Sequence, residues 1–501
     1  MKKMYITTPI YYVNDEPHIG HAYTTILADV INRYYKSIGY KTFFLTGTDE
    51  HGLKVQQAAV KNNVTPQQHV DKHVIAFKNI WEKLNIDHDF FIRTTDANHQ
   101  NKVKFALQTL FDKGEIYLDE YEGLYSISEE RFITQKEADE GGFREIKKIK
   151  EKNYFFKMSK YQDKLIQHIK ENPDFIKPES RKNEILGFLD KPLNDLCISR
   201  PKDRLEWGIE IPFDTNYVTY VWFDALLNYI SSIGWSENKN FESWWPADYH
   251  LIGKDILTTH AVYWPTMLMA LNVPLPKTIL AHGWWIMEDQ KMSKSLGNVI
   301  KPLDLAEEFS VDSLRYFLMR NMVLGQDSSF SRASFIKRYN SDLANDYGNV
   351  INRITILIKK NFDGLCPEPG KYDKTELGLI KLCEDIVNKV EKNMVKLKIH
   401  DALEAIFSLI REINKYLELK QPWKTIKVDK SQKGDAATCL YVSVELLRIS
   451  SELLFPFMPE KTRITINALS QEISHNLEFG IIKPYCSIEH PGALFPRIEN
   501  D

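Results

Sequence analysis

Cysteine is scarce in this chain and widely spaced along it. Five of the 501 residues are cysteine, and no two of them form a Cys-x-x-Cys pair. This spacing argues against a disulfide framework and against a zinc knuckle, so we expect a reducing compartment and no structural zinc.

Long apolar runs are absent as well. No stretch reaches the roughly 18 uncharged apolar residues that a membrane span needs. Pro9 also interrupts the N-terminus before the apolar region of a signal peptide could form. The sequence therefore predicts a cytoplasmic protein that has no membrane partner.

An excess of one charge is also missing. Lys and Arg total 65 against 68 Asp and Glu, so the net charge is −3 and a globally basic nucleic-acid binder is excluded. Any nucleic-acid partner must meet a local basic patch. The chain is instead 43% hydrophobic and 27% charged, as soluble globular proteins are. Its length favours roughly two to four domains.

The first fifty residues predict a βαβ unit. Residues 4–8 form a short β-rich run, residues 22–38 carry apolar side chains at helical spacing up to Gly39, and residues 41–45 form a second strand. The same order of strand, helix and strand returns at residues 249–252, 261–271 and 277–282. We interpret the two units as halves of one parallel nucleotide-binding sheet, separated by an insertion.

The insertion covers residues 115–210. Charges alternate densely over residues 129–152, which indicates a solvated ribbon or a small surface module. Beyond residue 340 the strand patterns vanish and apolar positions keep a 3.6-residue period, with prolines as breaks. The C-terminal part is therefore predicted to be an all-helical bundle.

His18-Ile-Gly-His21 lies where the turn after the first strand becomes the first helix. A helix N-terminus offers unpaired N–H groups and a positive dipole end, and Gly20 lets a ligand approach the backbone. The two imidazoles add donors for phosphate oxygens, so the motif suits a nucleoside triphosphate. In the alternative interpretation, the histidines only cap the helix.

Lys291-Met-Ser-Lys-Ser295 follows the last predicted strand of the sheet. Its lysines can swing onto a polyphosphate and neutralise the charge that develops on departing pyrophosphate. The first four letters also occur at residues 157–160, inside the insertion and without a trailing glycine. We interpret that copy as coincidental surface sequence, because ligands of open α/β sheets collect at strand ends.

Together the two motifs resemble the double signature of class I aminoacyl-tRNA synthetases. Further matches, from residue 4 to about residue 460, narrow the resemblance to the methionyl-tRNA synthetase family in its bacterial type without zinc-knuckle cysteines. The matching segments are Thr8-Pro-Ile-Tyr-Tyr12, Thr46-Gly-Thr-Asp-Glu-His-Gly52, Tyr220-Val-Trp-Phe-Asp-Ala225 and Ile252-Gly-Lys-Asp255.

The resemblance implies an α/β, Rossmann-like parallel-sheet catalytic domain with an inserted connective module, followed by an all-α anticodon-binding helix bundle. The two halves of the catalytic domain are expected at residues 1–114 and 211–289, on either side of a connective module at 115–210 that helps admit the acceptor end of tRNA. A linking domain with the Lys-Met-Ser-Lys-Ser loop is expected at residues 290–340, and the helical anticodon-binding domain at 341–501.

The resemblance also implies the reaction and the residues that bind ATP. L-methionine attacks the α-phosphate of ATP, with Mg²⁺ on its phosphates, and the methionyl group of the resulting adenylate passes to tRNA(Met), initiator and elongator. His18, His21, Lys291 and Lys294 are implied as catalytic. The residues implied to bind ATP are His18, Gly20, His21, Gly253, Asp255, Lys291, Ser293 and Lys294.

The methionine pocket implied by the family can also be assessed from the chemistry of its residues. A thioether substrate suits an aromatic site with one carboxylate for the ammonium group. Asp49 would bind the ammonium, Tyr12 and His260 would supply polar contacts near the sulfur, and Trp222 and Trp264 would enclose the thioether. The implied residues are Ile10, Tyr12, Asp49, Trp222, Ala225, Leu226, Tyr229, Ile256, His260 and Trp264. Ordinary core packing is the alternative for the two tryptophans, and Leu226 replaces a proline that some members carry.

The anticodon-binding residues implied by the family are Asn349, Arg353 and Trp423. Asn349 and Arg353 are four residues apart, so they share one face of a helix and can contact base edges. Trp423 follows Pro422 at a predicted helix break, where an indole can stack on a base. The alternative is that Trp423 packs in the bundle core and Arg353 forms a surface ion pair.

The sequence also argues against three other interpretations. Adjacent side chains at a strand end diverge, so Asp49, Glu50 and His51 are not expected to bind a metal ion. Synthetases for leucine, isoleucine or valine carry larger editing insertions than residues 115–210 provide. A catalytically dead tRNA-binding protein is disfavoured by the intact histidines and lysines.

The chain lacks room for the C-terminal tRNA-binding domain that makes some relatives dimeric, so we expect a monomer.

Overall fold

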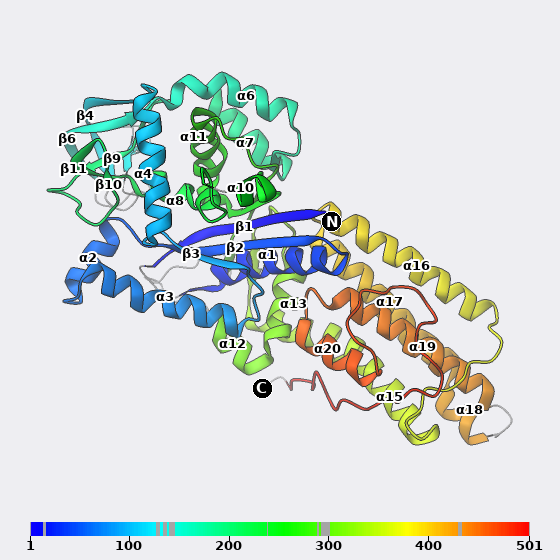
Figure 1. Ribbon diagram of the computed structural model, residues 1–501. Coiled ribbons are helices and arrows are strands. Elements are labelled where there is room, and N and C mark those ends of the chain that lie inside the picture. Colours follow the sequence, from blue (N-terminus) through cyan, green and yellow to red (C-terminus); the bar gives the residue numbers. More distant parts are fainter. Residues whose placement is uncertain are drawn as a thin grey trace.

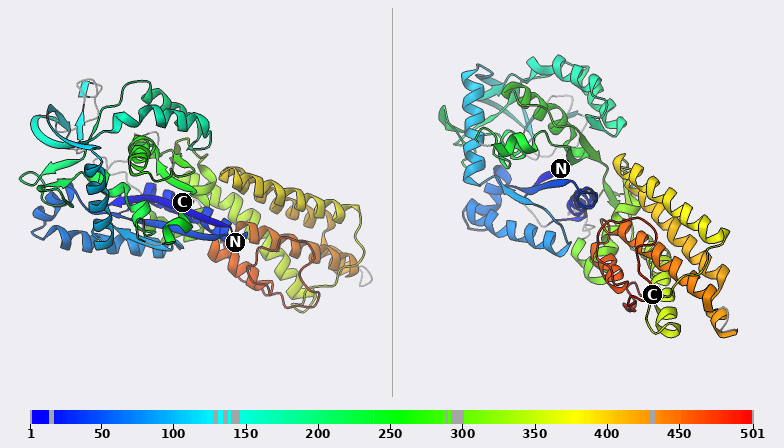
Figure 2. Two further views of the ribbon diagram at one scale, coloured as in Figure 1. Left: turned by 45° about the horizontal axis from the view of Figure 1, so that its top comes forward. Right: turned by 45° about the vertical axis from the view of Figure 1, so that its right-hand side comes forward.

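The structure is a computed structural model that describes residues 2–13, 17–126, 131–133, 138–139, 146–237, 239–287, 290–291, 301–428 and 433–499. The N-terminal body contains the main sheet, and helices α15 to α20 extend from it as a separate bundle (Figure 1). Two further views show the same elongated arrangement (Figure 2).

The described residues form one six-stranded parallel sheet in the order β3-β2-β1-β12-β13-β7. Side chains alternate between its two faces: Met4 and Ile6 belong to one hydrophobic core, and Tyr5 between them belongs to a second core. The strands are β1 (Lys3–Tyr12), β2 (Lys41–Asp49), β3 (Phe90–Arg93), β7 (Ile176–Lys177), β12 (Tyr249–Gly253) and β13 (Ile279–His282).

Helices cover both faces of this sheet (Figure 1). On one face lie α1 (Ile19–Ser37), α2 (Leu53–Lys61) and α3 (Pro66–Lys83). On the other lie α4 (Ala97–Asp112), α8 (Val221–Leu226), α9 (Asn228–Ser231), α10 (Lys239–Trp244), the short helix η2 (Lys254–Ile256), the π-helix η3 (Thr259–Tyr263) and α11 (Trp264–Leu271). Gly39, at φ +84°, ends the first helix as expected, because glycine adopts a positive φ without strain.

The insertion forms a long antiparallel ribbon with two helices beside it. Strands β4 and β6 pair from Ile116↔Phe156 to Ser126↔Ile146. A ribbon or a small surface module was expected at residues 129–152; residues 146–152 of this stretch belong to β6, and residues 129–130, 134–137 and 140–145 lie outside the described residues. Strand β7 instead pairs with β13, so residues 115–210 also supply an edge strand to the main sheet. The other elements here are β5 (Arg131–Ile133), η1 (Met158–Tyr161), α6 (Gln162–Glu171), α7 (Glu179–Leu189), β8 (Leu196–Cys197), β9 (Ser199–Pro201) and β10 (Glu210–Ile211). Strand β11 (Asp214–Thr219), just after the insertion, pairs with β9 and β10.

The linking segment joins the sheet to the bundle. It contains β14 (Trp285–Met287), β15 (Gln290–Lys291), α12 (Pro302–Phe309), α13 (Val311–Asn321), β16 (Ser328–Phe330) and α14 (Arg332–Arg338). The bundle follows with the π-helix η5 (Tyr339–Gly348), α15 (Asn349–Asn361), α16 (Lys374–Val395), α17 (Ile399–Lys420), α18 (Pro422–Val428), α19 (Lys433–Leu454) and α20 (Pro459–Ala468). The expected fold class, a parallel-sheet α/β part with an insertion and a helical bundle after it, is confirmed.

Candidate active site

A cavity of about 490 Å³ opens where the main sheet reverses its strand order, at the carboxyl ends of β1, β2, β12 and β13. This edge is where ligands of open parallel sheets bind, and the volume is in the range of small-ligand pockets. Its lining residues are Pro9, Ile10, Tyr11, Tyr12, His18, Gly20, His21, Thr24, Asp49, Lys54, Val221, Trp222, Gly253, Asp255, Ile256, His282, Gly283, Trp284 and Trp285.

The polar part of the cavity is built on the first turn of α1. His18 is the N-cap residue: the backbone N–H of Gly20 donates to its Nδ1 at 3.1 Å, and the N–H of His18 donates to Nδ1 of His21 at 3.2 Å. The two rings stack with their centroids 3.8 Å apart. Capping and pocket lining are therefore not exclusive alternatives for these histidines.

The capping bonds determine which ring nitrogens carry hydrogen. A neutral imidazole that accepts at Nδ1 carries its proton at Nε2, so each ring keeps an Nε2–H donor. Burial lowers the pKa of His18, although Asp255 opposes the shift. Burial and the neighbouring His18 ring hold the pKa of His21 well below its ordinary value. Both rings are therefore neutral donors near pH 7.

The cavity lining also includes apolar and aromatic side chains and the carboxylate of Asp49. Ile10, Tyr12, Trp222 and Ile256 line it together with Asp49. They come from different elements, since Ile10 and Tyr12 end β1, Asp49 ends β2, and Trp222 lies in the first turn of α8. Half of the residues implied for methionine binding therefore line this cavity.

Glu50 and His51, which follow Asp49, do not line the cavity. Arg93 donates to both carboxylate oxygens of Glu50, at 2.7 and 2.9 Å, and His51 Nδ1 lies 2.6 Å from Asp224. His99 contacts the same Asp224 carboxylate at 2.7 Å. Burial alone would raise the pKa of Asp224, but the two imidazoles lower it overall. Glu50 and His51 thus take separate partners, while Asp49 lines the cavity.

The other five residues implied for methionine form a buried layer that does not line the cavity. His260 Nδ1–H donates to the Ile256 carbonyl at 3.0 Å, so its Nε2 accepts from the Tyr229 hydroxyl at 2.8 Å. Trp264 is fully buried and donates to His250 at 3.2 Å. In this structure Trp264 therefore packs as a core residue. Ala225 and Leu226 are also buried.

Gly253 and Asp255 lie beyond the end of β12. A Cβ atom on Gly253 would lie 2.5 Å from Asp255 Oδ1, so only glycine leaves this carboxylate in place. The indole N–H of Trp284 donates to the same oxygen at 3.0 Å. Lys254 lies over the Trp284 ring at 4.0 Å and pairs with Asp327 at 2.7 Å.

The Lys-Met-Ser-Lys-Ser motif lies mostly outside the described residues. For Lys291 the structure gives the backbone in β15, and Ser293 and Lys294 are not described. The second copy forms η1 and lines no part of the cavity. Its Met158 is buried and Lys160 pairs with the buried Glu115, so this copy is part of the insertion's packing rather than bare surface sequence.

Several residues of the cavity lining were not expected from the sequence. Thr24 Oγ1 bonds His282 Nε2 at 2.7 Å, and both residues line the cavity. Thr24 lies one turn after His21 on α1, and His282 is the last residue of β13, so both positions could have been found from helix and strand periodicity. Trp284 lies two residues after the end of β13, where neither helix nor strand periodicity indicates that it lines the cavity.

Two of the three residues implied for the anticodon contact each other. The Arg353 guanidinium lies 4.7 Å from the Trp423 ring centroid and pairs with Glu418 at 2.8 Å. Asn349, one turn earlier on α15, donates to Asn414 at 3.1 Å. Lys420 is paired with Asp373 and Glu376. The half-buried indole of Trp423 packs partly against the bundle core.

Within the described part of the chain, no group of three or more His, Cys, Asp or Glu side chains is arranged to bind a metal ion. Among those same residues, no helix combines the length and apolar character needed to cross a membrane.

Two family profiles match almost the entire chain. The profile described as "tRNA synthetases class I (M)" matches residues 4–141 and 143–355, and "Anticodon binding domain of methionyl tRNA ligase" matches residues 366–501. The chain belongs to the methionyl-tRNA synthetase family.

Individual members of the methionyl-tRNA synthetase family agree with this assignment. The methionine--tRNA ligase of Caldanaerobacter subterraneus subsp. tengcongensis is 43% identical over 508 residues, which cover 99% of this chain and 79% of the relative. That of Rickettsia felis is 43% identical over 510 residues and 99% of both chains. The Mycobacterium tuberculosis methionyl-tRNA synthetase in complex with methionyl-adenylate superposes with a TM-score of 0.95 at 40% identity, over 99% of this chain and 100% of that one.

Proposed function

We propose that this chain activates L-methionine with ATP and transfers the methionyl group to tRNA(Met). The observation that carries the proposal is one cavity at the sheet switch point. Its lining combines the donor-rich N-terminus of α1 with aromatic side chains and the carboxylate of Asp49. This combination suits a nucleotide and an apolar amino acid bound side by side.

The aromatic end binds methionine. Asp49 accepts from the α-ammonium group, and Trp222, Ile10 and Ile256 contact the side chain. Tyr12 supplies a polar contact near the sulfur, and the buried pair of Tyr229 and His260 supports the wall from behind. Ala225, Leu226 and Trp264 complete this supporting layer. A thioether suits such a site because it is polarisable and makes favourable contacts with rings.

The N-terminus of α1 binds the triphosphate. The Nε2–H groups of His18 and His21 donate to phosphate oxygens, while Gly253 and Asp255 bind the ribose. A methionine carboxylate oxygen attacks the α-phosphorus, and the bond to the β-phosphate breaks as pyrophosphate departs with its electron pair. Lys291, Ser293 and Lys294 stabilise that charge. Mg²⁺ enters with ATP on its phosphates.

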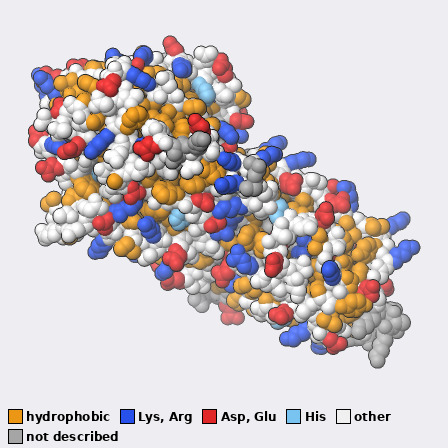
Figure 3. Space-filling view, viewed as in Figure 1, with side chains coloured by type: hydrophobic (Ala, Val, Ile, Leu, Met, Phe, Trp, Pro, Cys, Tyr) orange, Lys and Arg blue, Asp and Glu red, His pale blue; other side chains and the backbone are white. Residues whose placement is uncertain are grey.

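The adenylate then reacts with tRNA. A hydroxyl of the terminal ribose attacks the methionyl carbonyl, and AMP leaves. The insertion at residues 115–210 helps to admit this end of the tRNA, and Asn349, Arg353 and Trp423 recognise the anticodon. The net charge is −3, yet Lys and Arg side chains gather near the junction between the body and the bundle (Figure 3). A local basic surface of this kind meets the need for phosphate contacts.

Further properties belong to the same proposal. The catalytic halves are residues 1–114 and 211–289, the linking domain is 290–340 and the anticodon domain is 341–501. The chain acts as a cytoplasmic monomer on initiator and elongator tRNA alike. It needs no structural zinc, since residues 115–210 contain a single cysteine, Cys197.

ATP–pyrophosphate exchange with each amino acid in turn tests the proposed function. We expect exchange to depend on methionine and to be weak with leucine, isoleucine and valine. Exchange that follows one of those three amino acids would assign a different synthetase. Absence of exchange, with retained tRNA binding, would assign a catalytically dead tRNA-binding protein.

A further inference from the structure

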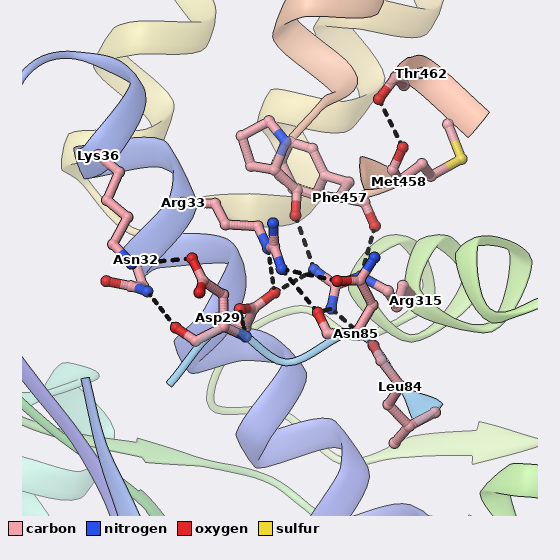
Figure 4. A network of polar contacts seen from close by, with 12 residues as sticks. Asp29, Asn32, Arg33, Lys36, Leu84, Asn85, Arg315, Phe457, Met458 and Thr462 are labelled. Atoms are coloured by element: carbon pink, nitrogen blue, oxygen red, sulfur yellow. Dashed lines mark hydrogen bonds and ion pairs between the residues drawn. The ribbon is translucent and has the colours of Figure 1, made fainter. Parts of the chain in front are cut away.

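Three parts of the chain that are distant in sequence meet at one buried arginine, Arg315 of α13 (Figure 4). They are the middle of α1, the turn after α3, and the turn between α19 and α20. This arginine lines no part of the cavity, and neither the mechanism nor the resemblance uses it.

All five N–H donors of Arg315 are used, and they reach all three parts. One Nη2–H donates to Asp29 Oδ2 at 2.6 Å. The carbonyls of Leu84 and Asn85 accept from Nη1 at 3.2 and 3.3 Å. The carbonyls of Pro456 and Phe457 accept from Nη2 and Nε at 2.9 and 3.0 Å. A guanidinium is rigid and planar, so these bonds fix the relative positions of their acceptors.

The charges at this point favour an arginine there. Asp29 is fully buried and also accepts from Arg33 Nε at 2.7 Å, so one carboxylate serves two guanidinium groups. The carbonyls at residues 84–85 and 456–457 follow the C-terminal ends of α3 and α19, where the helix dipole is negative. These oxygens supply the remaining compensation for the buried positive charge.

We call Arg315 and its five acceptors the joint. The joint connects the cavity to the helical bundle, which are the two parts of the molecule that a bound tRNA must contact at the same time. His18, the N-cap residue of α1, lines the cavity, and the same helix carries Asp29 three turns later. On the other side, α19 and α20 belong to the bundle that carries Arg353 and Trp423. The α1 face of the sheet and the bundle share one hydrophobic core. Asp312 of α13 adds a second link, because its carboxylate accepts from the Lys461 N–H at 2.6 Å.

We propose that Arg315 is a positioning residue that fixes the bundle relative to α1, so that recognition of the anticodon is coupled to charging at the cavity. This inference rests on the proposed function. A loosened joint would leave both sites intact but would place the two ends of the bound tRNA less accurately. Adenylate formation needs the cavity and the Lys-Met-Ser-Lys-Ser motif, neither of which contains Arg315, so its rate would not change.

Arg315→Lys and Asp29→Asn test the joint from its two sides. The lysine keeps the charge but cannot reach both pairs of carbonyls, and the asparagine keeps the shape of the carboxylate without its charge. We expect kcat/KM for charging methionine tRNA to fall by roughly ten- to hundredfold, as remote misplacement by about 1 Å does. Methionine-dependent pyrophosphate exchange should stay within about twofold of wild type. The preference for methionine tRNA over a transcript with an altered anticodon should shrink.

Arg448→Lys is the matched control. Arg448 is buried, pairs with Glu445 at 2.9 Å and donates to the carbonyls of Asn476 and Glu478, all within the bundle and the C-terminal segment after it. It should leave the ratio of charging to exchange and the anticodon preference unchanged.

The anticodon preference is a ratio, so partial unfolding does not alter it. The inference would be overturned if the anticodon preference were unchanged in both Arg315→Lys and Asp29→Asn, or if charging and exchange fell equally in them. It would also be overturned if Arg448→Lys showed the same selective loss of charging. Lack of methionine-dependent exchange in the wild-type chain would instead overturn the proposed function, and the inference with it.

Discussion

Gly20→Ala changes the first turn of α1 by a single methyl group. A Cβ atom at this position would lie 2.9 Å from Cε1 and 3.1 Å from Nδ1 of His18. The first distance is shorter than real Cβ contacts, so the His18 ring must rotate away. That rotation breaks the 3.1 Å bond from the Gly20 N–H to Nδ1 and the stack of the His18 and His21 rings.

The magnitudes of the two consequences differ widely. Loss of an N-cap bond costs about 1 kcal/mol of stability, and the replacement of glycine by alanine in a helix returns roughly 0.5–1 kcal/mol. The free energy of unfolding should therefore change by less than about 1 kcal/mol. Removing a preorganised donor from a charged transition state typically lowers kcat by roughly 10²–10³-fold, and we expect this range for pyrophosphate exchange.

Exchange kinetics and urea unfolding of the same preparation check this prediction. Gly187→Ala in α7 is the control, because its added Cβ meets no atom within 4 Å. It should leave exchange unchanged and raise stability slightly. If Gly20→Ala keeps exchange within about twofold of wild type, His18 does not hold the triphosphate in the way that we infer. A loss of several kcal/mol of stability would contradict the local account of the clash.

Three further predictions address other parts of the chain. Lys294→Ala should lower kcat for exchange by roughly 10²–10³-fold with little change in methionine binding, whereas Lys157→Ala, in the second copy of the motif, should do little. The opposite pattern would assign the catalytic role to the copy at residues 157–160. Trp423→Ala should cost about 1–3 kcal/mol in tRNA recognition and leave exchange intact; a loss of several kcal/mol of folding stability would assign the indole to the bundle core instead. Burial lowers the pKa of His260 to about 4, so the folded state binds fewer protons than the unfolded state between that value and 6.5. Stability should fall as the pH drops through this range, with His260 contributing about 1.3 kcal/mol of the loss between pH 7.5 and 5.5. Urea unfolding of His260→Asn at both pH values should show a correspondingly smaller loss, and an unchanged pH dependence would contradict the assignment.

Much of the main sheet could be predicted because its pattern is local. β1, α1 and β2 follow one another with clear alternation and helical spacing, and Gly39 marks the end of the helix. Strand β7 could not be predicted, since Ile176 and Lys177 are too few residues to show a period and join the sheet only through β13. The expected helix at 261–271 begins in the π-helix η3. The spacing of apolar residues over such a short segment does not distinguish a π-helix from an α-helix.

The lining of the cavity was predictable where residues follow strand ends. Tyr12, Asp49 and Gly253 end β1, β2 and β12, and the carboxyl ends of parallel strands meet at one edge. The local sequence does not indicate whether a residue near that edge lines the cavity or is buried behind its lining. Both Trp222 and Trp264 are therefore expected to enclose the thioether, although only Trp222 lines the cavity and Trp264 is buried. The joint at Arg315 could not be predicted from the sequence either, because the acceptors of its hydrogen bonds lie in segments far apart in the chain.

Single-turnover transfer tests the central claim most directly. The chain would be incubated with ATP and labelled methionine, separated from free substrates by gel filtration, and mixed with tRNA(Met). We expect labelled methionyl-adenylate to remain bound to the protein, and the label to pass to the tRNA in an amount equal to the bound adenylate. Failure to isolate a labelled adenylate, or label that never reaches the tRNA, would contradict the account.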